Sequence, residues 1–106
     1  MFARNISLYL KPHTITEFVQ TMDSEIVPLL RRQKGFLDLV TLAVPGGREV
    51  VAISFWEHKG NARAYHSTGY PEVLKILEKF LEGTPHLRTF DVVSSTIQKV
   101  AAQVAG

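Results

Sequence analysis

The fold is decided by residues 36–56, whose sequence is FLDLVTLAVPGGREVVAISFW. Two runs rich in β-branched and aromatic residues, 36–44 and 48–56, flank the turn residues 45–47, and this pattern predicts a β-hairpin. The apolar side chains of the second run fall on both faces: Val51, Ile53 and Phe55 on one, and Val50, Ala52 and Trp56 on the other. Because a solvated antiparallel sheet alternates between apolar and polar residues, both faces of this sheet must be covered.

The segments before the hairpin predict a strand followed by a helix. Residues 4–11 alternate between apolar and polar side chains, which is the period of a half-buried strand. After Pro12 the apolar residues recur at helical spacing, and Thr14 with Glu17 predicts a capping box at the start of that helix. Pro28 lies inside the helix and predicts either a kink or a tighter last turn.

The segments after the hairpin predict two more helices and a last strand. Residues 58–67 form the first of these helices, and the second runs from Pro71, suited to a first turn, to Gly83. Residues 86–99 form the last strand. Because this strand is longer than the other three, we expect its excess to cross to a partner subunit. The tail, residues 101–106, is expected to be frayed.

These elements predict an α+β fold of ferredoxin-like βαββαβ type, with a four-stranded antiparallel sheet and helices on one face. The chain has 106 residues, which is enough for one domain spanning residues 1–106 and too few for two. Its own helices can cover one face of the sheet. A second copy of the chain is the simplest cover for the other, so the sequence predicts a homodimer.

Composition excludes several classes of function. The net charge is +2 with acids and bases interspersed, which does not indicate a nucleic-acid-binding protein. Residues 34–36 open like the aromatic signature of an RNA recognition motif, but Leu37 and Asp38 then break that signature. The four histidines lack metal-ligand spacing, and there is no cysteine. We therefore expect no metal site, and, without a signal-peptide pattern or membrane segment, a cytoplasmic location.

The stretch from Ser54 to Leu77, SFWEHKGNARAYHSTGYPEVLKIL, resembles the antibiotic biosynthesis monooxygenase family. An aromatic residue ends the third strand, a short polar turn follows, and two helices come next; Gly35-Phe36 also matches the family's pattern at the start of the second strand. The resemblance implies a dimeric α+β barrel with a pocket between sheet and helices in each subunit. It further implies either cofactor-independent oxygenation of phenolic or quinol substrates, or haem degradation.

Carried over residue by residue, the resemblance is mixed. Trp56 matches the strand-end tryptophan that lines the pocket of the quinone-forming oxygenases. Their strand asparagine is Ala52 here, their pocket tyrosine is Ala62, and their helix arginine falls near Lys75. The haem-degrading branch needs a histidine ligand near the position of Lys75. Because a lysine amine is protonated at neutral pH, we expect no haem and no other cofactor.

The resemblance and the strand pattern together name candidate site residues. For substrate binding they are Asn5, Ser7, Ser54 and Trp56; for catalysis they are Tyr65, His66 and Lys75. Trp56 would stack on an aromatic substrate, Tyr65 would donate a hydrogen bond, His66 would act as a general base and Lys75 would stabilise an anion. On a helix, adjacent residues point about 100° apart, so Tyr65 is expected to face inward and His66 outward.

Each candidate also has an ordinary structural reading. Trp56 and Tyr65 are residue types that fill cores and dimer interfaces, and His66 would be a surface histidine. Asn5 and Ser7 would face the partner subunit or buried water. The sequence therefore leaves two functions open: a cofactor-independent monooxygenase, or a non-catalytic dimeric protein that binds or senses a small molecule.

Overall fold

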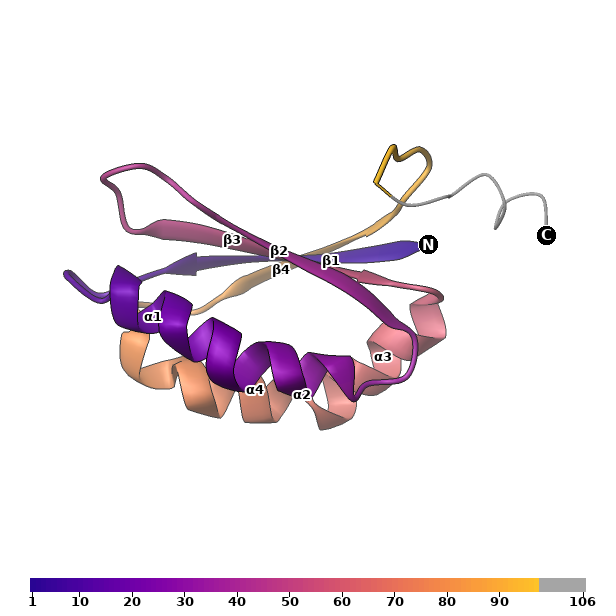
Figure 1. The fold of residues 1–106 in the computed structure, drawn as a ribbon, viewed down its shortest axis with the longest axis horizontal. Helices are drawn as coiled ribbons and strands as arrows, with labels where there is room; N and C mark the ends of the chain where they lie inside the picture. Colours follow the sequence, from indigo (N-terminus) through magenta and orange to yellow (C-terminus); the bar gives the residue numbers. More distant parts are fainter. Residues whose placement is uncertain (98–106) are drawn as a thin grey trace.

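A four-stranded antiparallel sheet with helices packed on one face forms the described part of the computed structural model, residues 1–97 (Figure 1). The strand order is β2-β3-β1-β4. The strands are β1 (Phe2–Tyr9), β2 (Phe36–Ala43), β3 (Glu49–Trp56) and β4 (His86–Asp91). This arrangement confirms the α+β, ferredoxin-like fold predicted from the hairpin and its flanking segments.

The register of the central strands decides which side chains reach the helices. β1 pairs with β3 so that Phe2 lies opposite Trp56 and Leu8 lies opposite Val50. Because successive side chains of a strand alternate between faces, the even-numbered residues of these two strands face the helices and the odd-numbered ones face away. The buried residues Leu8, Val50 and Trp56 belong to the helix-facing set.

The first helix is continuous but changes its winding. It consists of α1 (Ile15–Thr21), a π-helical segment η1 (Met22–Ile26) and α2 (Val27–Arg31). Pro28 stands in the first turn of α2, directly after the wider segment. A proline has no N–H to donate and its ring crowds the carbonyl four residues earlier, and wider turns relieve both problems. The sequence predicted a kink or a tighter turn here, whereas the helix widens.

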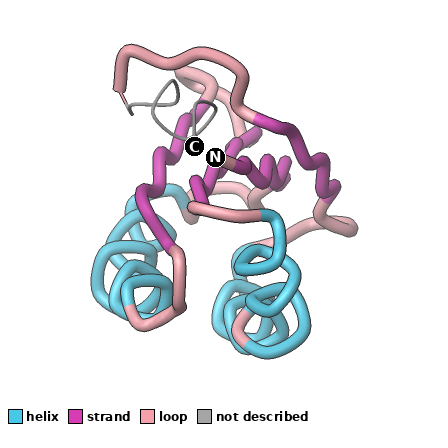
Figure 2. Tube along the Cα trace, turned by 90° about the vertical axis from the view of Figure 1, so that its right-hand side faces the viewer, coloured by secondary structure: helices cyan, strands magenta, loops and turns pink. Residues whose placement is uncertain are grey.

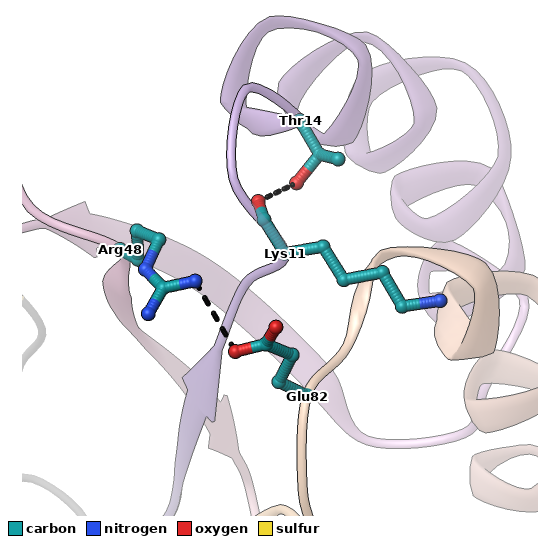
Figure 3. Close-up of polar contacts among 4 residues, drawn as sticks. All are labelled: Lys11, Thr14, Arg48 and Glu82. Carbon is teal, nitrogen blue, oxygen red and sulfur yellow. Dashed lines mark hydrogen bonds and ion pairs between the residues drawn. The ribbon is translucent and has the colours of Figure 1, made fainter.

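The predicted capping box at the start of this helix is wrong. The Thr14 hydroxyl donates a hydrogen bond to the Lys11 carbonyl oxygen at 2.8 Å, so it turns back to the preceding loop instead of capping α1 (Figure 3). Beside this loop, an exposed ion pair joins Arg48 to Glu82 at 3.2 Å. Such an exposed pair contributes at most about 1 kcal/mol to stability.

The remaining helices are α3 (Lys59–Thr68), α4 (Tyr70–Leu77) and the short 3₁₀ helix η2 (Glu78–Phe80). Gly69 separates α3 from α4, and Pro71 lies in the first turn of α4, as predicted. Figure 2 shows the helices as two groups on the same side of the sheet. An edge-to-face contact between Phe18 and Phe80, with ring centroids 6.0 Å apart, joins the two groups in the core.

The last strand is shorter than predicted. β4 ends at Asp91, which pairs with Phe2, and the N–H of Val92 donates to the Met1 carbonyl at the very start of the chain. Residues 92–97 form no strand in the structure, so the prediction of strand over them is wrong. The rest of the predicted strand and the predicted frayed tail, residues 101–106, lie outside the described residues.

The face of the sheet away from the helices carries apolar side chains beside polar ones such as Asn5 and Ser7, and no other element of residues 1–97 covers it. Its exposed apolar side chains are Val40, Leu42, Val44 and Phe90. Leu42 keeps 51% of its surface exposed, and Phe90 keeps 41%. The expectation that this chain's helices cover one face is therefore confirmed for the described residues. None of the helices in this part of the chain is long and apolar enough to cross a membrane.

Gly35, between α2 and β2, generates a test of the fold. It adopts a φ of +80°, its carbonyl accepts the N–H of Glu57, and a Cβ there would meet the side chain of Asn61. Gly46 has a φ of +71° but open space around it. We expect Gly35→Ala to lower the free energy of unfolding by about 2 kcal/mol or more, and Gly46→Ala by about 1 kcal/mol. Equal losses in urea denaturation would contradict the packing described for Gly35.

Candidate functional site

A narrow cavity of about 40 Å³, the central cavity, lies between the sheet and the helices. Strands β1, β2 and β3 line one side of it, and the first helix, α3 and α4 line the other. Most of its lining is apolar. Among the described residues its polar lining comes from Arg4, Ser54, Tyr65 and Tyr70. The cavity holds a few water molecules at most, because one water needs roughly 10–15 Å³ of such space.

Arg4 is the charged group of this cavity. It lies on the helix-facing side of β1, opposite Ser54, and only 3% of its surface is exposed. Its Nη1 lies 3.1 Å from Nδ1 of His66, while its Nη2 is buried and has no hydrogen-bond partner within residues 1–97. The guanidinium carbon lies 5.1 Å from the ring centroid of Tyr65 and 4.7 Å from that of Tyr70. The faces of these two rings therefore contact the guanidinium where a carboxylate would usually pair with it.

The electrostatics of Arg4 leave an uncompensated positive charge in the cavity. Burial lowers the pKa of Arg4, although a guanidinium stays protonated in proteins, and the neighbouring Tyr65 and Tyr70 act in the opposite direction. Burying an unpaired ion costs several kcal/mol. Each cation–π contact returns about 0.5–2 kcal/mol. No carboxylate of the described chain pairs with Arg4, so part of this cost remains.

Tyr65 forms an aromatic wall of the cavity, and Trp56 packs behind it. Tyr65 lies on α3 and stacks on Trp56, with ring centroids 4.9 Å apart and planes 28° apart. Trp56 is fully buried behind it, and its indole N–H donates to Oγ of Ser54 at 2.9 Å. Burial raises the pKa of Tyr65, and the smaller effect of Arg4 lowers it. At neutral pH Tyr65 is therefore a neutral phenol, which can donate a hydrogen bond but cannot accept a proton.

Tyr70, in the first turn of α4, faces the same guanidinium. Burial raises its pKa too, and the nearby charge of Arg4 opposes that shift. Its ring stacks on His66 with centroids 5.3 Å apart and planes 24° apart. Tyr70 thus links the cavity to the surface of α3, where His66 is exposed.

His66 acts on Arg4 rather than on the cavity. A guanidinium has donors only, so Nδ1 of His66 must accept this hydrogen bond. The proton of the neutral imidazole then sits on Nε2. In this geometry neither ring nitrogen is free to take a proton from a molecule in the cavity. His66 instead holds the guanidinium in place over the two tyrosines.

The structure brings together four of the predicted site residues: Ser54, Trp56, Tyr65 and His66. As expected, Tyr65 faces inward and His66 outward. Asn5 and Ser7 lie opposite Ile53 and Val51, on the sheet face away from the helices, so they do not line this cavity. Lys75 lies on the exposed side of α4, in a surface hollow with Glu78.

Sequence reasoning missed Arg4 and Tyr70. The signal for Arg4 was present, because it stands two residues before Ile6 and four before Leu8, on the face that those apolar residues mark as buried. A cation in a buried row is unusual and points to a function. Tyr70 gave no such signal. Within residues 1–97, no three histidine, aspartate or glutamate side chains gather as a metal site would require.

Comparisons with known proteins identify relatives of the chain. The sequence profile described as antibiotic biosynthesis monooxygenase matches residues 1–90. A monooxygenase from Streptomyces coelicolor, gene ActVA-Orf6, solved with nanaomycin D, is 19% identical over 92% of both chains, with a TM-score of 0.76. SnoaB, a cofactor-independent oxygenase from Streptomyces nogalater, is 16% identical over 92% of this chain and 97% of its own, with a TM-score of 0.74.

A third structure, Rv0793 from Mycobacterium tuberculosis, is 14% identical over 90% of this chain and 97% of its own, with a TM-score of 0.69. At such identities these structures establish the fold and not the activity. No curated protein sequence matches the chain significantly.

The raised pKa of Tyr65 predicts how stability responds to alkali. Between pH 10, where an unfolded tyrosine ionises, and the raised pKa, the unfolded chain binds fewer protons than the folded one. Stability is therefore complete below pH 10 and falls above it, by about 1.4 kcal/mol per pH unit for each such tyrosine. Tyr65→Phe should flatten the fall measured by urea denaturation. An unchanged slope in the variant would contradict the burial of this phenol.

Proposed function

Because the chain belongs to the antibiotic biosynthesis monooxygenase family, we propose that it is a cofactor-independent monooxygenase acting on a small phenolic or quinol-like substrate in the central cavity. One observation carries this proposal: a buried cation, Arg4, stands among aromatic rings in an otherwise apolar cavity. The similar monooxygenase from Streptomyces coelicolor was solved with the ligand nanaomycin D, which supports the proposal that this chain also binds a small molecule.

The proposed reaction begins with loss of a proton from the substrate, whose carbanion then reacts with dioxygen. A ring CH₂ group loses two hydrogens and gains one oxygen atom, becoming a carbonyl; the second oxygen atom leaves with those hydrogens as water. The substrate supplies all four electrons. A dry site with donors aimed at the developing oxyanion lowers the barrier of such a step.

Each polar residue of the cavity has a part in this scheme. Arg4 stabilises the substrate anion by charge, and Tyr65 and Tyr70 donate hydrogen bonds to its oxygens. Ser54 and Trp56 hold the ring of Tyr65, and His66 holds the guanidinium of Arg4. Since about 40 Å³ is too small for an aromatic substrate, binding also requires side chains at the edge of the cavity, such as the half-buried Leu74, to move.

A second function, non-catalytic binding of a small molecule, is favoured by one specific observation. Among the described residues that line the cavity, the polar groups are a guanidinium, a hydroxyl and two phenols, and none is a base at neutral pH. A protein that only binds or senses its ligand needs none. In the proposed enzyme, the substrate must be acidic enough to lose its proton to solvent.

The proposed enzyme is tested by oxygen consumption with a panel of hydroquinones and anthrones. We expect substrate-dependent uptake with one dioxygen consumed per carbonyl formed, undiminished by a metal chelator. Tyr65→Phe should slow turnover by about tenfold or more, since it removes one donor to the oxyanion, and Trp56→Ala should do so by loosening Tyr65. Absence of uptake across the panel would favour the binding protein.

We also propose that the chain works as a homodimer joined through the open face of the sheet. Ile53 lies in β3, at the middle of this face, and is partly buried by its neighbours. Ile53→Glu should convert the dimer to a monomer in sedimentation experiments, because it would place a charge in an apolar interface. Val19→Glu, at an exposed apolar residue of α1, is the matched control and should leave the dimer intact. A monomeric wild-type protein would refute this proposal.

A further inference from the structure

The bonding of Arg4 is incomplete in a way that points to a ligand. Arg4 lines the central cavity and has only 3% of its surface exposed to solvent. His66 accounts for Nη1, whereas Nη2 has no partner among residues 1–97. A buried donor of a charged group is rarely left unpaired, because it loses water and gains nothing in return. The missing partner is therefore an acceptor, and a negatively charged one satisfies the charge as well.

A second hollow also borders Arg4 and has the same sign of charge. This basic groove lies between α3 and β4, and its positively charged lining consists of Lys59, Arg63 and Arg4. Leu87 and Thr89 of β4 form its other side. No acidic residue of the described chain lines it. A cleft lined by one sign of charge concentrates ions of the opposite sign, so the basic groove would draw anions toward Arg4.

We propose that Arg4 binds the anionic group of the ligand, a carboxylate or an ionised phenol on an aromatic ring, and that the basic groove guides this anion to it. This inference rests on the proposed function for the location of the ligand in the central cavity. It adds the class of ligand: one that carries a negative charge before any chemistry occurs. Where the anionic group is an ionised phenol, it also accounts for a cavity without a base, because loss of the phenolic proton already gives the electron-rich anion that reacts with dioxygen.

The placement of the neighbouring rings fits such a ligand. An aromatic carboxylate has a flat apolar body and a charged end. Its body would lie among the apolar side chains of the sheet and first helix, and its carboxylate would meet the guanidinium between Tyr65 and Tyr70. A guanidinium offers two parallel donors to a carboxylate, of which His66 occupies one at present.

The inference is tested with two ligands that share a naphthalene ring and differ in charge, 2-naphthoate and 2-naphthylmethanol, by isothermal titration calorimetry of the purified protein. We expect the naphthoate to bind about tenfold or more tightly than the alcohol, since a hydrogen bond to a charged partner exceeds one to a neutral group. The affinity for naphthoate should fall with added salt more steeply than that for the alcohol. Equal affinities for the two ligands would overturn the inference.

Substitutions test whether the preference for naphthoate over the alcohol depends on Arg4. Arg4→Gln should weaken naphthoate binding by about tenfold or more and change alcohol binding little. Arg48→Gln removes the same charge from an exposed arginine that lies outside both cavities, and it should leave both affinities unchanged. Preference for naphthoate that survives in Arg4→Gln would overturn the assignment. Should Arg4→Gln fail to fold, Arg63→Gln in the basic groove provides the test: it should slow naphthoate association and leave the alcohol unaffected.

The two proposals fail in different ways. Charge-selective binding through Arg4 without oxygen uptake would refute the monooxygenase and support this inference. Oxygen uptake that is equally fast with neutral substrates and in Arg4→Gln would support the monooxygenase and overturn this inference.

Discussion

The site depends on one buried interaction, the Arg4 guanidinium enclosed by Tyr65, Tyr70 and His66 without a carboxylate. β1 brings Arg4 to the helix side of the sheet, and the break between α3 and α4 at Gly69 lets residues from both helices face it. Burying a charge is costly, and the aromatic rings offset part of that cost. What remains is a site prepared for a negative charge.

Much of the fold could be predicted from the sequence, because local patterns decide it. The two-sided apolar strand ending in Trp56, the turn at residues 45–47 and the break at Gly69 all follow from side-chain period and turn chemistry. The strand that was predicted too long shows the limit of such reasoning. Residues 92–97 have strand-forming composition, but the pairing between β1 and β4 ends at Phe2 and Asp91, a limit that only the register reveals.

The site was predicted only in part, and the errors have a common cause. A strand pattern tells which residues share a face but not which face meets the helices, so Asn5 and Ser7 were grouped with Trp56 although they point away from it. The helix pattern placed Tyr65 and His66 correctly on α3. It could not show that the hydrogen bond between His66 and Arg4 turns a candidate base into a support for a cation.

The most direct measurement of the central claim is a crystal structure of the protein with a brominated aromatic carboxylate, in which the anomalous signal of bromine locates the ring. We expect the ring to lie in the central cavity, with a carboxylate oxygen about 2.7–3.0 Å from Nη2 of Arg4. A ligand bound elsewhere, or one whose carboxylate faces away from Arg4 while Nη2 pairs with a group of the protein itself, would contradict it.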